Sequence, residues 1–392
     1  DINIYILYFI YLGNTVLSYL LFAYKKSLWE ASQNNGIENR LAAFTNILMY
    51  VGQLAALFST HNYYVYIIFL PLSTLLQNIM RSHMVDKMYP QYRCKGNVEA
   101  GFVKKLFLKV KALLGHKIGT TVITSADSIV ISSMLGLEVL AIYSNYYQIV
   151  NALIGFVTVI YTATMASIGN SIITVSRSRV YQNFKTLTFM NNCLVGWFSV
   201  CMLCLYQPFM EIWMGEKLLF PFKVVVLYVL YFYSWLARRI GLTYKDAAGM
   251  WEQDFWKPYV GALVNLVSNI FLCFFIGIEG VLVSTIIVMV FIYFPWETRV
   301  LFKYLFKESA RKYVFKMGVY VFVTTVNCII TYNVCNFVIG KGIFALITRA
   351  AVCAVLPNIV YLIAYFKMPE FIDSKKRILE ILHRVGVKPR EE

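Results

Sequence analysis

The stretch PFKVVVLYVLYFYSWLARRIGLTYK, residues 221–245, shows the pattern that decides the fold: an apolar run followed closely by cations. A helix rises about 1.5 Å per residue, so about 20 apolar residues cross a hydrocarbon core of about 30 Å. The pattern recurs along the chain and predicts eleven membrane-spanning helices. They cover residues 4–23, 41–59, 63–84, 118–135, 139–168, 187–213, 221–240, 256–276, 279–297, 314–335 and 343–366.

The distribution of Lys and Arg predicts the orientation of these spans. If residue 1 lies outside and each span reverses the side, nearly all of the 36 Lys and Arg fall in or beside cytoplasmic loops. The exceptions are Lys217, Lys223, Lys341 and Arg349. Cytoplasmic loops carry an excess of Lys and Arg, so the pattern predicts a cytoplasmic C-terminal end.

Composition supports a polytopic membrane protein. The chain is 59% hydrophobic and 14% charged, whereas a soluble domain is about 25% charged. A net charge of +16 in a soluble protein would suggest nucleic acid. Here the cations follow the topology, so we expect anionic membrane lipids as partners and no nucleic acid.

The start of the chain is unusual for such a protein. It begins without Met, and an odd number of spans starts outside. We therefore expect further spans upstream of residue 1. The alternative is an intact protein with an exposed N-terminus.

The longest connection between spans, residues 85–117, lies on the predicted cytoplasmic side. Within it, residues 102–114 place apolar side chains on one arc of a helix and lysines on the other. This pattern predicts an amphipathic helix in the headgroup region. The alternative is that it packs on the protein's own cytoplasmic surface.

Two parts of the chain share a weak internal repeat. A first set of residues comprises Tyr24, Lys25, Trp29, Glu30 and Asn46. The second set, Tyr244, Lys245, Trp251, Glu252 and Asn265, follows at offsets of 220, 220, 222, 222 and 219 residues. Both copies run from outside to inside, so a repeat would be related by an axis along the membrane normal.

Asp127 is the most informative single residue for function. It lies about 13 Å along the helix from Ile118, near the bilayer midplane, where a carboxylate is costly unless it is hydrated or paired. Its half of the helix also carries Thr120, Thr121, Thr124, Ser128 and Ser132. This predicts one wall of a water-filled cavity on a solute or ion path. The alternative is a buried Asp127 held by hydrogen bonds to a neighbouring helix.

The next predicted span carries a polar stripe. Ser144, Gln148, Asn151, Gly155, Thr158 and Thr162 recur three or four residues apart. Gln148 and Asn151 can bind sugar hydroxyls, but small and hydroxyl residues also allow helices to pack closely. Both interpretations stay open. On the first, Ser144, Gln148 and Asn151 belong with Asp127, Thr124 and Ser128 to a substrate path.

Cations at the inner ends of two spans are candidates for a cytoplasmic entrance. Lys25, Arg238, Arg239 and Lys245 could receive an anionic headgroup, because an unpaired phosphate in hydrocarbon is very costly. The alternative is that they anchor the helix ends to lipid headgroups. Arg349, about 9 Å into the last span, is expected to snorkel to the outer surface.

The sequence contains no pattern typical of an enzyme or a metal centre. Cys201-Met202-Leu203-Cys204 has CxxC spacing, but without a nearby His or second Cys pair it predicts packed thiols. The four histidines are not spaced as catalytic groups or metal ligands, and no phosphate-binding glycine loop occurs. We therefore expect a protein that is not an enzyme and has no cofactor or metal.

Several segments resemble polysaccharide repeat-unit flippases of the multidrug, oligosaccharidyl-lipid and polysaccharide exporter superfamily. The most similar are TSADSIVIS (124–132), LGLEV (135–139), YSNY (143–146) and ASIGN (166–170). Others are SYLLFAYK (18–25), residues 245–251, DFWKP (254–258), Asn265, GIEG (277–280) and PWE (295–297). Each motif is diffuse, but their order extends over nearly the whole chain.

The resemblance implies an all-α, polytopic membrane fold with two helical bundles around a central cavity and two extra C-terminal helices. The complete protein would have about 14 spans, of which this chain would contain the last eleven. The implied parts are residues 1–84 (half of the N-terminal bundle), 85–117 (cytoplasmic linker), 118–302 (C-terminal bundle), 303–368 (two additional helices) and 369–392 (cytoplasmic tail).

The resemblance also implies a function. Such a flippase moves an oligosaccharide linked to undecaprenyl pyrophosphate from the inner to the outer leaflet of a bacterial plasma membrane, for capsule or exopolysaccharide assembly. The mechanism would be alternating access. A polysaccharide polymerase and other assembly proteins are candidate partners. One alternative is a drug/cation antiporter of the same superfamily. Another is a membrane glycan polymerase or acyltransferase, against which the short outer loops argue.

Overall fold

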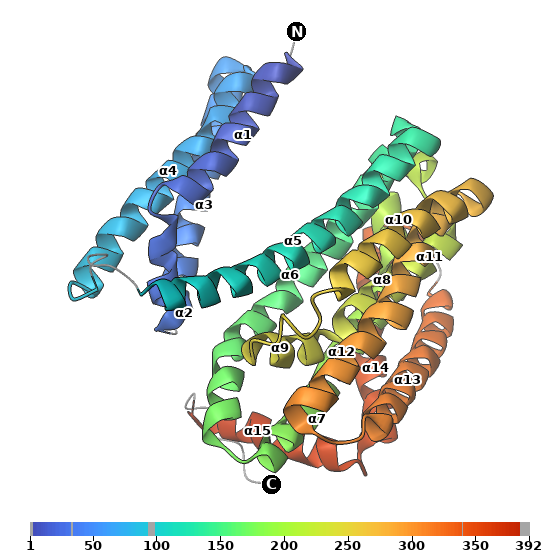
Figure 1. The fold of residues 1–392 in the computed structure, drawn as a ribbon. Helices are drawn as coiled ribbons and strands as arrows, with labels where there is room; N and C mark the ends of the chain where they lie inside the picture. Colours follow the sequence, from blue (N-terminus) through green and yellow to red (C-terminus); the bar gives the residue numbers. More distant parts are fainter. Residues whose placement is uncertain (1–2, 33, 93–98, 339, 385–392) are drawn as a thin grey trace. The chain divides into compact units, whose positions relative to one another are not determined.

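The computed structural model describes residues 3–32, 34–92, 99–338 and 340–384, and within these ranges it is helical and contains no strand (Figure 1). Nine of the described helices are long and apolar enough to cross a membrane, or ten if one bent pair counts as a span. The chain divides into two compact units, Asp1–Glu99 and Ala100–Glu392.

The first unit is a three-helix assembly with a short helical insertion. Its elements are α1 (Ile4–Leu20), η1 (Ala23–Lys25), α2 (Lys26–Ala31), α3 (Asn35–Thr60) and α4 (Tyr63–Met88). Both α1 and α3 pack on α4. The chain bends by 49° between α1 and the η1–α2 segment. Trp29 of α2 is completely buried against Leu41 and Val85, so this small cluster fixes the bend against the α3–α4 hairpin.

The second unit begins with three long helices. These are α5 (Ala100–Met134), α6 (Leu137–Thr174) and α7 (Arg177–Met214). After η2 (Glu216–Leu218) come α8 (Phe222–Ala237), α9 (Arg239–Ala247) and α10 (Lys257–Ile276). The next span, Ile278–Phe306, is continuous but alternates α11 (Ile278–Ile287), the π-helical η3 (Val288–Tyr293), α12 (Phe294–Val300) and the π-helical η4 (Leu301–Phe306). The last elements are α13 (Arg311–Asn336), α14 (Ile343–Tyr365) and α15 (Pro369–Arg384).

Helix α7 organises the core of the second unit. It packs against α8, α13, α14 and α15, and its side chains Phe184, Val195 and Met210 are completely buried. The rings of Phe184 and Phe306 lie 4.9 Å apart, within the range of favourable aromatic pairs. The two C-terminal spans therefore belong to the same packed body as α7.

Nine of the eleven predicted spans correspond to helices that could cross a membrane. The predicted span 4–23 bends after Leu20, and span 118–135 lies in α5, which is not among those nine. Residues 102–114 do not form a separate helix. They are the first part of α5, which continues without interruption to Met134. Gly115 and Gly119 lie where the interfacial segment was expected to end, and a Cβ at either would collide with Tyr259 or Pro258 of α10. This GxxxG spacing lets the two backbones approach closely. The packing of α5 along α10 is visible in Figure 1.

Part of the predicted tail 369–392 is also ordered structure. Helix α15 packs on α7, where the rings of Phe189 and Phe371 are 6.4 Å apart. Lys316 of α13 forms an ion pair with Glu370 at the start of α15. Residues 385–392 lie outside the described residues.

Candidate functional site

A pocket of about 430 Å³ lies in the second unit, near the helix ends that the sequence predicts to be cytoplasmic. Helices α5, α8, α9, α10 and the Ile278–Phe306 span all contribute to its wall. Its lining residues are Leu113, Lys117, Ile123, Trp235, Arg238, Arg239, Leu242, Lys245, Asp246, Trp251, Lys257, Pro258, Met289, Tyr293 and Glu297.

A connected series of buried ion pairs lies along the wall of this pocket. The Arg238 Nη1 donates to both carboxylate oxygens of Glu297, at 2.6 and 2.8 Å. Lys257 Nζ lies 2.8 Å from Glu297 and 2.9 Å from Asp254. Lys245 Nζ lies 2.7 Å from the same Asp254 oxygen. All five side chains are at least nine-tenths buried, so each charge depends on its neighbours for compensation.

Local structure brings Arg238 to this position. Helix α8 ends at Arg238 and α9 starts at the next residue. Met289, Tyr293 and Glu297 follow one another at four-residue spacing on the opposite span. Met289 Sδ lies 3.2 Å from Arg238 Nη2, and the Tyr293 ring centroid lies 5.2 Å from the guanidinium carbon. The guanidinium is therefore held by a carboxylate, a thioether and an aromatic face together.

The pocket carries more positive than negative charge. It contains the cations Lys117, Arg238, Arg239, Lys245 and Lys257. Three carboxylates oppose them: Asp246 and Glu297 in the wall and Asp254 behind it. Among the residues that the structure describes, no carboxylate lies within 4 Å of the Arg239 guanidinium. Arg239 therefore holds its charge in a partly dehydrated space without a close acidic partner in the described part of the chain.

Two buried donor groups in the wall have no hydrogen-bond partner in the described part of the chain. They are Arg238 Nε and the Tyr293 hydroxyl. A buried donor without a partner costs about 1–3 kcal/mol, so such groups are uncommon and call for an explanation. Both atoms are enclosed by protein, and the Tyr293 hydroxyl lies against Gly261 of α10, so an anion could reach them only after these side chains move.

Three of the four predicted entrance cations meet in this pocket. Arg238, Arg239 and Lys245 all line it. The fourth, Lys25, belongs to the first unit, where its Nζ lies 2.6 Å from Asp86 and 2.8 Å from the Ser82 hydroxyl. The structure thus brings the first three to one pocket, while within its own unit Lys25 has a local acidic partner.

Asp127 lies in a buried polar network between helices. It is 6% exposed, and its Oδ1 accepts a 2.6 Å hydrogen bond from Asn269 of α10. Asn269 also accepts from Ser284, and Asn265 donates to Thr285 at 3.0 Å. The geometry thus corresponds to the alternative in which neighbouring helices hold Asp127, rather than to a residue on a water-lined wall.

The other predicted substrate-path residues lie elsewhere. Ser144, Gln148 and Asn151 are on an exposed face of α6, while Tyr143 and Tyr146 of the same helix point into the core. Ser128 is half-buried, and the Thr124 side chain lies outside the described residues. The structure therefore does not join Asp127 and the α6 stripe into one site.

Sequence reasoning missed three ion-pair partners in the cationic pocket, two acids and one base. Glu297, Asp254 and Lys257 were seen only as parts of diffuse motifs. A signal for them existed, because ionisable residues within or beside apolar spans are rare and usually paired. Their pairing could not be read from the sequence, since Arg238 and Glu297 are 59 residues apart.

Comparison with protein-family models, with curated proteins and with solved structures found no match to this chain. The cationic pocket and the Asp127 network are therefore interpreted from their own chemistry.

Proposed function

We propose that this protein is a membrane flippase that moves undecaprenyl-pyrophosphate-linked oligosaccharide repeat units from the cytoplasmic to the outer leaflet of a bacterial plasma membrane. The observation that carries the proposal is the pocket around Arg238 and Arg239, where several cations line one cavity and no carboxylate that the structure describes lies close to Arg239. The long apolar helices and the predicted orientation support a role in carrying a substrate across the membrane.

The pocket chemistry fits a pyrophosphate headgroup. A pyrophosphate offers several negatively charged acceptor oxygens, and hydrogen bonds between arginine and phosphate oxygens are among the strong ones. Arg239 supplies charge without a close carboxylate competitor, while the Tyr293 hydroxyl and Arg238 Nε would supply further donors once their side chains turn toward the substrate. The ion pairs with Glu297 and Asp254 hold the remaining cations in place before the substrate enters.

The ion pairs also determine which variants give a clean test. Replacing Arg238 or Lys245 would leave Glu297 or Asp254 short of a buried partner, so folding would suffer first. Arg239→Gln and Tyr293→Phe remove a charge and a hydroxyl without orphaning a carboxylate. We expect each to lower glycan export and to leave the lipid-linked oligosaccharide on the inner leaflet.

The matched control is Arg179→Gln, which removes an exposed cation at the start of α7, outside the pocket. Export and the leaflet distribution of the lipid-linked glycan would be measured in cells at equal protein abundance. Normal export in the Arg239→Gln, Tyr293→Phe double variant would refute the pocket as the headgroup site. Drug efflux without glycan export would instead support the antiporter.

The proposed role of Asp127 in the translocation path can be tested separately. Asn can accept from Asn269 as Asp127 does, so Asp127→Asn should keep the fold while removing a charge that transport could use. We expect reduced export at unchanged membrane abundance. Unchanged export would leave Asp127 with only its structural role in the network.

The proposed direction of transport depends on the orientation of the spans. Leu137, at the start of α6, and Ser176, just after its end, are both exposed. In a variant without native cysteines, Leu137→Cys should react with a membrane-impermeant thiol reagent added outside, and Ser176→Cys should not. The opposite labelling pattern would reverse the orientation.

A further inference from the structure

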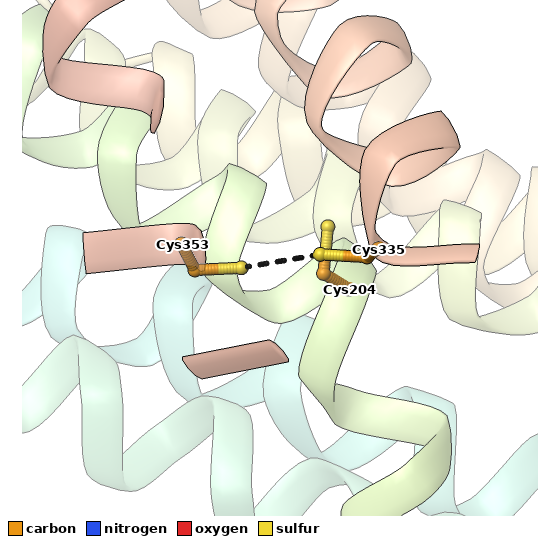
Figure 2. A group of neighbouring side chains, drawn as sticks. All are labelled: Cys204, Cys335 and Cys353. Carbon is orange, nitrogen blue, oxygen red and sulfur yellow. Dashed lines mark hydrogen bonds between the residues drawn. The ribbon is translucent and has the colours of Figure 1, made fainter. Parts of the chain in front are cut away.

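Three cysteines from three different helices meet in the interior of the second unit. They are Cys204 of α7, Cys335 of α13 and Cys353 of α14, and all three are buried. Their sulfur atoms all lie within 4.8 Å of one another. Figure 2 shows the thiols of Cys335 and Cys353 pointing toward each other, with Cys204 beside Cys335.

We propose that Cys204, Cys335 and Cys353 bind one monovalent, thiophilic metal ion of the Cu(I) class. The Sγ atoms of Cys335 and Cys353 are 3.9 Å apart. Two thiolates that each bind one metal at about 2.3 Å, at tetrahedral or trigonal angles, lie about 3.8–4.0 Å apart. A disulfide would instead require about 2.05 Å. The spacing is thus already that of two ligands on a shared ion.

The donor set favours Cu(I) over zinc. Structural zinc sites almost always have four protein ligands, whereas this group offers three, and no His, Asp or Glu in the described part of the chain joins it. Thiolates are soft ligands that select Cu(I). Cys201, one helical turn before Cys204, packs against the cluster but does not belong to the mutually close group.

Arg349 brings a positive charge to the small cavity that Cys204 and Cys335 also line. It lies one turn before Cys353 on α14, and its backbone oxygen is 4.0 Å from Cys335 Sγ. Its Nε is buried and has no hydrogen-bond partner among the described residues. Three thiolates around a monovalent cation carry two net negative charges, so a neighbouring guanidinium would reduce the cost of burying them.

A small cavity offers a path to the site. It has a volume of about 190 Å³, and Cys204, Cys335 and Arg349 line it together with Gln207 and Glu211. An ion could reach the sulfur atoms from the end of the helices that the sequence predicts to be outside. A metal site needs such an entry path as well as suitable ligands.

The binding step is an exchange of protons for metal without a change of oxidation state. Cu⁺ forms bonds to the three sulfur atoms, and the three thiol protons leave to solvent. The bound ion would connect α7 to α13 and α14. Because a ligand that binds only the folded state stabilises it, the ion should raise the unfolding temperature of the chain.

The test is a titration of the purified, reduced chain in detergent with Cu(I), in competition with a chromophoric Cu(I) chelator. We expect one tightly bound Cu(I) per chain, and X-ray absorption should show only sulfur neighbours at about 2.3 Å. Cys353→Ser and Cys335→Ser should weaken binding by at least about 100-fold, since even outer-shell changes cost about 10–100-fold. Cys273→Ser, a buried cysteine outside the cluster, is the matched control and should bind as the parent does.

A second variant keeps the test decisive if single substitutions disturb folding. A chain that retains Cys204, Cys335 and Cys353, with the other five cysteines replaced by Ser, should still bind one Cu(I) and gain thermal stability from it. Failure of this variant to bind, in a folded and monodisperse state, would overturn the proposal. Parent-like affinity in folded Cys353→Ser would overturn it as well, because the ion would then lie elsewhere.

Discussion

The helical hairpins α3–α4 of the first unit and α10–α12 of the second contain the same kind of buried ion pair with opposite polarity. In the first, the acid Glu38 lies near the start of α3, and the base Arg81 on α4 contacts it at 2.5 Å. In the second, the base Lys257 begins α10, and the acid Glu297 on α12 lies 2.8 Å away. The weak repeat in the sequence thus has a counterpart in the helix order, since each hairpin follows a long helix and a short one.

The difference between the two hairpins lies in what surrounds the pair. Both carboxylate oxygens of Glu38 accept hydrogen bonds from Arg81, and the third contact of Arg81 is the side chain of Asn78. The two charges therefore neutralise each other, and neither has another charged partner among the described residues. Glu297 instead forms ion pairs with both Arg238 and Lys257. Lys257 in turn pairs with Asp254, and this series of ion pairs lies beside a pocket. The same position can therefore fix two helices in one unit and shape a candidate binding site in the other.

The largest expected effect comes from removing the shared acid of the second hairpin. Glu297→Gln leaves the buried Arg238 without a carboxylate and Lys257 with only Asp254, which Lys257 shares with Lys245, whereas Glu38→Gln affects Arg81 alone. Breaking a buried pair costs about 3–5 kcal/mol, so we expect both variants to be destabilised and Glu297→Gln to be affected more. Unfolding midpoints in detergent would measure this. Equal losses would show that Arg238 does not depend on Glu297.

Exchanging the acid and the base of the first hairpin between its two helices offers a sharper test of the comparison. If the position requires only a neutral pair, Glu38→Arg combined with Arg81→Glu should recover most of the stability that either single change loses. The double-variant cycle isolates the coupling between the two residues. A double variant no more stable than the single ones would show that Asn78 and the local backbone require Arg81 in its present place.

An intermediate loss of stability is expected from adding a Cβ at the close helix contacts inside the two hairpins. A Cβ on Gly280 would collide with the backbone at Leu272, whereas a Cβ on Gly52 would meet the ring of Phe69. Backbone cannot move aside as easily as a ring, so Gly280→Ala should cost about 1–3 kcal/mol and Gly52→Ala less.

The control for these two variants is Gly318→Ala, where no atom lies within 4 Å of the added Cβ. It should be neutral or slightly stabilising, because Ala favours a helix over Gly by about 1 kcal/mol. The same thermal unfolding measurement applies to all three. A larger loss for Gly52→Ala than for Gly280→Ala would contradict the packing difference.

The smallest effect is expected at an exposed ion pair outside the spans. Lys341 lies 2.5 Å from Glu216, and this contact holds the pKa of Glu216 below its ordinary 4.5 and the pKa of Lys341 above its ordinary 10.5. The contribution of Glu216 is present above pH 4.5 and is lost as pH falls through its lowered pKa. That of Lys341 is present below pH 10.5 and is lost as pH rises through its raised pKa.

The contribution of this pair to stability should therefore not change with pH between those limits. It should also be small, so that Lys341→Gln barely changes the unfolding midpoint at neutral pH, because solvent screens exposed charges. Lys217→Gln, a change in the same outer region at a lysine that pairs with no described carboxylate, is the control. A loss comparable to that of Glu38→Gln would mean that burial is not what separates the strong pairs from the weak one.

The sequence alone determined where most of the helices lie and that Arg238, Arg239 and Lys245 follow closely on the end of an apolar run. Membrane thickness sets the length of an apolar run, and backbone groups in lipid must be satisfied within a helix, so local composition is sufficient for both. The start of α5 was less predictable, because packing of Gly115 and Gly119 on α10 lets one helix continue through the expected boundary.

Only the tertiary structure decided which residues are partners. Asp127 meets Asn269, 142 residues away, and the thiol cluster draws one cysteine from each of three helices. Sequence spacing fixes neighbours along one helix, but the rotation and offset of a neighbouring helix depend on the fit of whole surfaces. For that reason the charges of this protein could be listed from its sequence, while their pairing, their burial and the pocket between them became visible only in the folded chain.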